Sequence, residues 1–137
     1  MHSKNREALE RRVRSAAEAA LYRQKYVSAI DVFTGMGLLD PARVNAWRSG
    51  QLDFLERVIH LNLKRISLCM AAFRNWARAK GLKPSETAYL ARTHGGKRNL
   101  RFSKSGDPVL ETAYRTHFVL PRPPKDSPVT APLDDAL

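Results

Sequence analysis

Apolar residues in the first part of the chain recur at the spacing of a helix. Leu9, Val13, Ala16 and Ala20 follow one another at intervals of four and three, which places them on one helical face. Glutamate and arginine side chains four residues apart are neighbours on a helix and support it. We therefore predict a first helix over residues 6–25 that packs through this face.

Capping signals predict two short helices next. Ser28, with Asp31 three residues on, resembles a capping box, and Gly35 weakens the end of that helix. Asp40-Pro41 supplies an N-cap and a proline at the first helical position, and Gly50 closes the second helix.

The same pair of short helices also fits a helix-turn-helix. Residues around Arg43, Asn45 and Arg48 would then meet the major groove of DNA. An ordinary helical hairpin is the commoner arrangement, and the sequence leaves both interpretations open.

The longest periodic pattern runs from Leu52 to Lys80, with an interruption at Asn62, and predicts one long central helix. Its apolar residues at three-and-four spacing are Leu52, Leu55, Ile59, Ile66, Cys69, Phe73 and Trp76. The narrow polar stripe opposite them holds Arg57, His60, Lys64, Ser67, Arg74 and Arg78.

A β-hairpin is predicted near residues 87–104, around the turn His94-Gly95-Gly96-Lys97. Leu100 and Phe102 alternate with polar residues, as in a strand with one buried face. The first arm has an alternative, because Pro84-Ser85-Glu86 could equally open a short helix. The sequence leaves strand and helix open for this arm.

The last signals complete a single domain over residues 1–119. Asp107-Pro108 repeats the cap-and-proline pattern and starts a final helix through Tyr114. Five prolines between positions 121 and 132 predict a disordered tail over residues 120–137. The predicted class is mainly α with a small β-hairpin (α+β), a compact helical domain around one long central helix.

Charge changes this picture, because it is concentrated. The chain carries 24 Lys and Arg against 13 Asp and Glu, a net charge of +11. Residues 57–106 hold twelve Lys and Arg and one acid, Glu86, whereas the segments on either side nearly cancel. Gathered like charges oppose folding unless an anionic partner offsets them, so the sequence predicts that the protein binds nucleic acid, DNA or RNA.

The phosphate contacts are expected from the central helix and the hairpin, and the base or sugar contacts from Asn99 or Tyr89. Tyr89 and Phe102 would stack on bases if they were exposed, although packing is the better expectation for Phe102. The candidate nucleic-acid-binding residues are Arg57, Lys64, Arg74, Arg78, Arg92, Lys97, Arg98, Asn99, Arg101 and Lys104.

Three other interpretations compete with this one. The cations could be a solvated face paired with acids of the first helix. A protein-interaction module could bind an acidic partner, or use Trp47 and Trp76 at a helical interface. A metal-independent ribonuclease could use His94 and His117, which each end an Arg-Thr-His triplet, as acid and base.

Several chemistries are disfavoured, and no cofactor or metal is expected. Gly95-Gly96-Lys97 is followed by Arg98, where a phosphate-binding loop needs Ser or Thr. Metal-dependent nuclease chemistry needs clustered carboxylates, and the basic region has only Glu86. Cys69 and the histidines show no zinc-ligand spacing, so Cys69 is predicted to lie in the core.

The N-terminal sequence, the apolar runs and the single cysteine predict the cellular location. The N-terminal residues are polar and lack the apolar region of a signal peptide, and no apolar run is long enough to span a bilayer. One cysteine fits a reducing compartment. We expect a cytoplasmic protein without a membrane partner.

Three segments resemble an uncharacterised bacterial protein family over residues 26–118. They are Gly-Met-Gly-Leu-Leu-Asp-Pro-Ala-Arg-Val-Asn-Ala-Trp-Arg from Gly35, Lys-Pro-Ser-Glu-Thr-Ala-Tyr from Lys83, and Arg-Phe-Ser-Lys-Ser-Gly-Asp-Pro from Arg101. Longer members of that family continue into a cysteine-rich, zinc-ribbon-like segment, which implies nucleic-acid association by analogy. This chain has a proline-rich segment there instead, so the resemblance names a family without an activity.

Overall fold

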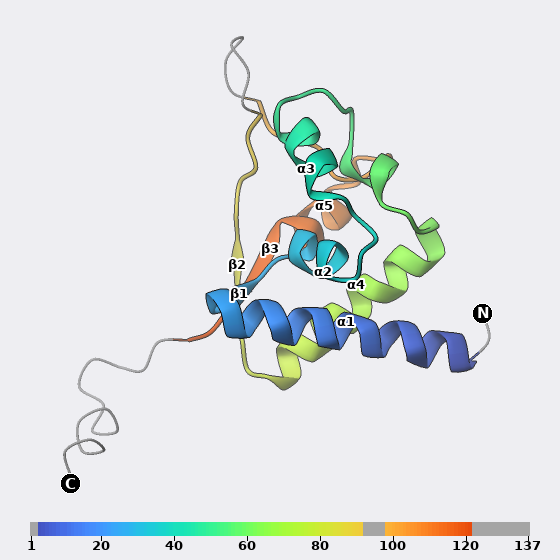
Figure 1. Ribbon diagram of the computed structural model, residues 1–137. Helices are drawn as coiled ribbons and strands as arrows, with labels where there is room; N and C mark the ends of the chain where they lie inside the picture. Colours follow the sequence, from blue (N-terminus) through green and yellow to red (C-terminus); the bar gives the residue numbers. More distant parts are fainter. Residues whose placement is uncertain (1–2, 92–97, 122–137) are drawn as a thin grey trace, which may run out of the picture.

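The computed structural model describes residues 3–91 and 98–121, and within them it is mainly helical with a small antiparallel sheet (Figure 1). The predicted α+β class is confirmed. Of the tail predicted over residues 120–137, residues 122–137 lie outside the described residues, whereas the Leu120 N–H donates to the Lys25 carbonyl at 3.1 Å, so the predicted disorder does not begin at Leu120. The elements are α1 (Ser3–Gln24), β1 (Tyr26–Val27), α2 (Ala29–Gly35), α3 (Pro41–Arg48), the 3-10 helix η1 (Leu55–Val58), α4 (Leu63–Ala79), β2 (Lys83–Glu86), α5 (Pro108–Arg115) and β3 (Thr116–Val119).

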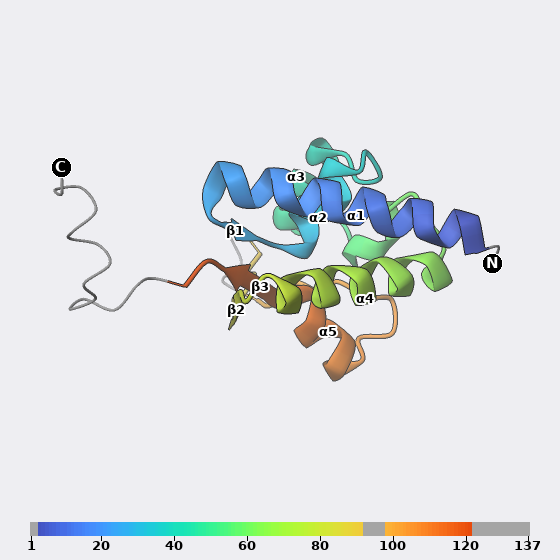
Figure 2. The same ribbon diagram turned by 90° about the horizontal axis from the view of Figure 1, so that it is seen from below.

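The first helix packs as its pattern predicts. The buried side chains of α1 are Leu9, Val13, Ala16, Ala17 and Ala20, and this face contacts α2 and α4. Seen from below, α4 lies between α1 and α5 (Figure 2). A Cβ added at Gly35 of α2 would come within 3.0 Å of the Ala16 Cβ, so the absence of a side chain there permits the close approach of the two helices.

The capping predictions are confirmed. Ser28 and Asp31 form the reciprocal capping box of α2. The Asp40 carboxylate accepts a hydrogen bond from the Ala42 backbone N–H at 2.9 Å, and the Asp107 carboxylate does the same at the start of α5. Each carboxylate satisfies a backbone donor that has no partner within its helix.

The predicted start of the central helix is wrong. The helix α4 begins at Leu63, after the Asn62 side chain accepts a hydrogen bond from the Arg65 N–H, and not at Leu52. The preceding backbone bonds elsewhere: the N–H groups of Leu55 and Glu56 donate to the carbonyls of residues 101 and 102, at 3.2 and 2.8 Å. These tertiary hydrogen bonds replace those that a continuous helix would make.

A three-stranded sheet, which the sequence analysis did not predict, ties the chain together. The strand β3 lies in the centre and pairs antiparallel with β1 and with β2. Residues 83–86 are therefore a strand, and the alternative of a short helix opening at Pro84 is wrong. The predicted hairpin arms do pair, because Leu90 and Asn99 form an antiparallel bridge and the Leu100 N–H donates to the Tyr89 carbonyl.

Aromatic residues fill the core between the hairpin and α5. The Phe102 ring lies 4.8 Å from Trp47, 5.0 Å from Tyr89 and 5.1 Å from Tyr114, measured between ring centroids. Tyr89 is 5% exposed and Phe102 is fully buried, so neither ring can stack on a base. Trp47 and Trp76 are also buried, which overturns the expectation that they mark an interface.

Candidate nucleic-acid interface

Two carboxylates fix the backbone that presents the cations of the 98–104 segment. Glu111, buried on α5, accepts hydrogen bonds from the Phe102 N–H at 2.9 Å and from the Ser103 N–H and hydroxyl at 2.7 and 2.6 Å. Glu56 accepts from the Lys104 N–H at 2.9 Å. Charge-assisted bonds of this kind are stronger than neutral ones, so the segment is held in one conformation.

Glu56 also accepts a 2.7 Å hydrogen bond from the Tyr114 hydroxyl. Burial, together with this bond and the negative charge of Glu56, raises the pKa of Tyr114. The phenol therefore stays protonated and keeps its role as a donor. It connects α5 to η1 beneath the basic segment.

Phe54 holds two arginine side chains beside this segment. The Arg57 Cζ lies 5.4 Å and the Arg101 Cζ 5.6 Å from the centroid of its ring. Phe54 is partly exposed and both arginines are exposed. Asp53 lies 3.9 Å from Arg57, so part of the Arg57 charge is offset, whereas Arg101 has no carboxylate within 4.0 Å among the residues described.

The same surface continues into a shallow depression of about 370 Å³. Its lining residues are Leu52, Asp53, Arg98, Asn99, Leu100 and Arg101. The Arg98 Nη2 lies 3.5 Å from the Gly50 carbonyl. We name the group formed by Phe54, Arg57, Arg98, Asn99 and Arg101 the Phe54 patch.

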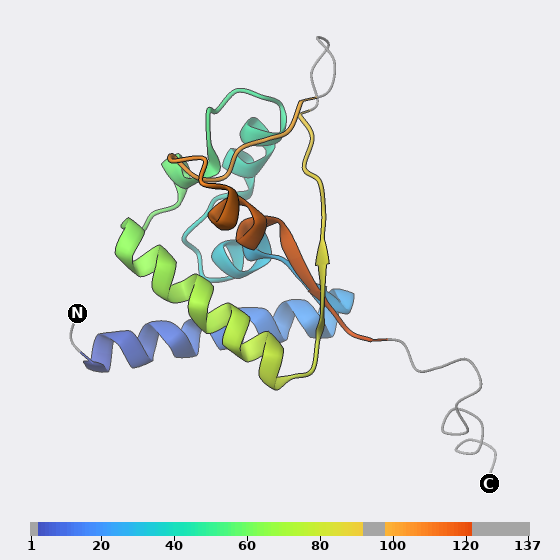
Figure 3. The same cartoon turned by 180° about the vertical axis from the view of Figure 1, so that it is seen from behind.

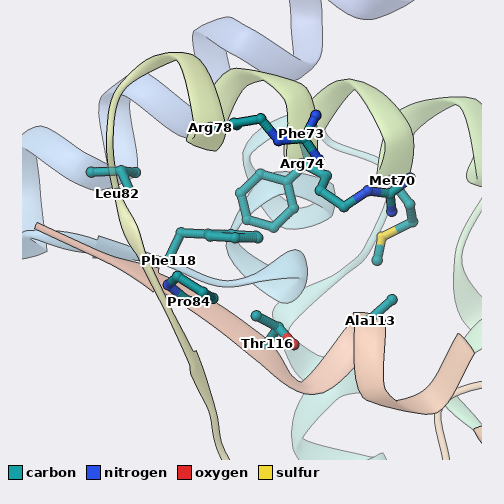
Figure 4. Close-up of a pocket in the computed structure, with 9 residues that line it drawn as sticks. All are labelled: Met70, Phe73, Arg74, Arg78, Leu82, Pro84, Ala113, Thr116 and Phe118. Atoms are coloured by element: carbon teal, nitrogen blue, oxygen red, sulfur yellow. The ribbon is translucent and has the colours of Figure 1, made fainter. Parts of the chain in front are cut away.

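Other predicted contact residues lie elsewhere. Figures 1 and 3 show that the C-terminal half of α4 is at the end of the molecule away from α3 and the 98–101 segment. Arg74 and Arg78 belong to that half and line a separate, apolar pocket (Figure 4). Lys64 is exposed in the first turn of α4. Lys104 lines a depression shared with Leu63 and Ser67.

Two predicted contacts, Arg92 and Lys97, lie outside the described residues, as does His94 of the ribonuclease hypothesis. The other histidine of that pair, His117, is half-buried on β3. Its Nε2 lies 2.6 Å from the Tyr89 hydroxyl and its Nδ1 3.5 Å from the Thr87 hydroxyl. Both ring nitrogens thus have protein partners.

Burial shifts the titration of this histidine and its neighbour. Desolvation lowers the pKa of His117, and it raises the pKa of Tyr89 to about 12. The histidine ring also stacks on Tyr26, with 5.5 Å between centroids. The side chain therefore links β3 to β1 and to the first hairpin arm.

Pairing of the basic residues with acids of α1 is limited. Lys80 contacts Glu18 of α1 at 2.7 Å, and hydrogen bonds from Lys80 and Trp76 lower the pKa of Glu18. In the described ranges, no carboxylate lies within 4.0 Å of the charged groups of Lys64, Arg74, Arg78, Arg98, Arg101 or Lys104. A solvated face neutralised by α1 therefore accounts for Lys80 and not for these cations.

The described residues contain no group of three or more His, Cys, Asp or Glu that could hold a metal ion. Cys69 is buried in the core, as predicted, and burial raises the pKa of its thiol to about 11. A thiol of that kind is unreactive at neutral pH. In the part of the chain that the structure describes, no helix is long and apolar enough to cross a membrane.

Phe54 is the member of the patch that sequence analysis missed. At 100° per residue Phe54 lies on the same side of the predicted helix as Ala72, at the edge of the apolar arc, so its position gave no signal of a surface role. Glu111 was missed as well, because nothing local in the sequence marks a carboxylate that accepts bonds from a distant segment.

Comparisons with models of protein families, with curated proteins and with solved structures gave no match. The family resemblance of the sequence therefore stays a prediction. A function has to be argued from the geometry and the charges of the described residues.

Proposed function

We propose that the protein binds nucleic acid through the Phe54 patch, with a preference for unpaired strands. The observation that carries this proposal is the pair of guanidinium groups over the ring of Phe54, at 5.4 and 5.6 Å. Single-stranded nucleic acid is recognised by stacking of its bases on aromatic rings or guanidinium planes. A duplex hides those base faces, so unpaired strands fit the patch better.

The arrangement of Arg57 and Arg101 over the Phe54 ring also favours the binding of nucleic acid. A free arginine loses side-chain entropy when it contacts a ligand, and a prearranged one loses less. Cation–π contacts at exposed sites stabilise each arrangement by about 0.5–1 kcal/mol. The carboxylates of Glu111 and Glu56 accept hydrogen bonds from the backbone N–H groups of Phe102 and Lys104, which also limits the freedom of this segment before it binds.

The remaining members of the patch supply the other contacts. Arg98 is exposed, lines the depression and would pair with a phosphate. The Asn99 amide can donate to and accept from a base edge. Phosphate contacts release bound counterions, so affinity should fall steeply with salt.

The test compares two double variants that remove the same charge. Arg98→Gln/Arg101→Gln changes the patch, and Arg74→Gln/Arg78→Gln changes the far half of α4. Fluorescence anisotropy with labelled single and double strands of DNA and RNA, at several salt concentrations, gives affinities and salt slopes. We expect the patch variant to weaken single-strand binding about tenfold or more, with a slope shallower by about 0.7 for each lost phosphate contact.

The variant Phe54→Leu tests whether the position of the two arginines matters for affinity, apart from their charge. It keeps the formal charge and an apolar side chain but removes the ring that positions both arginines, so affinity should fall up to about fivefold. Equal weakening by both double variants would mean that net charge alone attracts the polymer, and the proposed patch would be wrong. The absence of polymer binding at low salt would overturn the whole proposal.

A further inference from the structure

A second site lies at the other end of the molecule. A pocket of about 330 Å³ opens between α4, β2, β3 and α5 (Figure 4). Its interior is formed mainly by the apolar side chains of Met70, Phe73, Leu82, Ala113 and Phe118. A volume of this order is at the lower end of the range for small-molecule sites.

Two aromatic rings give the pocket a defined shape. Phe73 of α4 and Phe118 of β3 meet edge to face, with 5.1 Å between centroids. The ring of Phe73 also stacks on Trp76 at 6.2 Å. Phe73 belongs to α4, which packs on α1, and Phe118 belongs to the central strand of the sheet, so the pocket is part of the folded scaffold.

The polar side of the pocket is strongly basic. Arg74 and Arg78 both line it and lie one helical turn apart on α4 (Figure 4). Like charges at this spacing destabilise a helix. Within the described residues, neither guanidinium has a carboxylate within 4.0 Å, so the charges are available to an anion beside an apolar interior.

We propose that this pocket binds an aliphatic carboxylate, with its chain among Phe73, Leu82 and Phe118 and its carboxylate on Arg74 and Arg78. Guanidinium groups match the planar, two-oxygen geometry of a carboxylate. A purely apolar ligand would leave the cations unpaired, and an inorganic anion would leave the apolar walls in water. A single-chain carboxylate satisfies both.

This site is independent of the proposed nucleic-acid patch, because the two groups of residues share no member. The experiment titrates the full chain with acetate, hexanoate, octanoate and decanoate by isothermal titration calorimetry, below the concentrations at which they form micelles. Burial of one methylene is worth about 0.8 kcal/mol, so affinity should rise up to about fourfold per added methylene until the pocket is full.

Variants distinguish the two parts of the site. Arg74→Gln/Arg78→Gln should weaken decanoate about tenfold or more and leave the neutral decanol nearly unchanged. Ala113→Leu, which fills the pocket, should weaken both ligands. Arg98→Gln/Arg101→Gln removes the same charge elsewhere and should bind decanoate like the unchanged protein. Thermal melts establish that each variant is folded.

Three outcomes would overturn the proposal. One is decanoate binding that does not saturate at one molecule per chain, which indicates adsorption. Another is equal binding of decanoate and decylamine, because a cation should be rejected by the two arginines. The third is binding that neither Ala113→Leu nor the Arg74/Arg78 variant weakens.

Discussion

Single side chains decide where the cations of the 98–104 segment lie. Arg101 is exposed, but its carbonyl accepts hydrogen bonds from the Trp47 Nε1 at 2.8 Å and from the Leu55 N–H. The next two residues donate to the buried Glu111. Backbone groups turn inward to buried partners while the arginine side chain stays outside, so the polar core of this region positions its surface.

His117 makes the folded state sensitive to pH. An unfolded histidine has a pKa of about 6.5, and burial lowers the pKa of His117 in the folded protein, an effect that Asp31 opposes and Arg48 reinforces. The unfolded chain therefore binds the proton more readily. The contribution of neutral His117 to stability is fully present above about pH 6.5 and is lost as pH falls toward the folded pKa.

Urea unfolding between about pH 7.5 and pH 5.5 tests whether the protein loses stability as pH falls. The midpoint of the unchanged protein should fall with pH, and His117→Gln should flatten the profile. His60→Gln, at an exposed position, serves as the control and should leave the profile as it was. A profile that is equally steep in the His117 variant would show that other groups carry the pH dependence.

At the scale of elements, the caps predicted from sequence hold and the extent of the central helix does not. Asn62 interrupts the apolar pattern of the sequence, and in the structure it is the N-cap of α4. The side chain accepts the Arg65 N–H at 2.9 Å. The region before it forms η1, because its backbone bonds to residues 101 and 102.

The cap gives a prediction for α4. Asn62→Ala should lower the free energy of unfolding by about 1 kcal/mol, since it leaves a backbone donor of the first turn without its partner. Asn75→Ala, an exposed position within the same helix, is the matched control and should be neutral or slightly stabilising. Chemical denaturation measures both. If the two variants lost the same stability, the cap would not be the cause.

At the scale of the whole molecule, the predicted contact residues do not form one surface. The Phe54 patch joins residues around η1 to the 98–101 segment. Arg74 and Arg78 belong to the C-terminal half of α4, which Figures 1 and 3 show at the end of the molecule away from α3. Both sets of cations fall in one basic stretch of the sequence, because spacing along the chain marks the break at Asn62 but not the direction in which α4 runs after it. Separation of the charges is what allows two different anionic ligands to be proposed.

Net repulsion predicts how stability responds to salt. With a charge of +11, self-repulsion opposes the compact state, and about 0.1 M salt limits such interactions to roughly 10 Å. The melting temperature should therefore rise by a few degrees between low salt and physiological salt, as scanning calorimetry can show. A fall over the same range would mean that ion pairs such as Lys80 with Glu18 outweigh the repulsion.

The sequence by itself determined the features that depend on neighbours in the chain. Capping residues such as Ser28, Asp40 and Asp107, the apolar face of α1 and the burial of Cys69 follow from local spacing, because helical bonds and faces repeat within a few residues. The concentration of charge in residues 57–106 was also plain from the sequence.

Only the tertiary structure decided the contacts between distant segments. The sheet pairs residues about ninety positions apart, such as Tyr26 and Val119. Folding also brings the backbone of residues 101–104 to the carboxylates of Glu56 and Glu111. It buries Tyr89 and places two arginines over the ring of Phe54. Such contacts depend on which surfaces pack together, and the spacing of residues along the chain does not predict that packing.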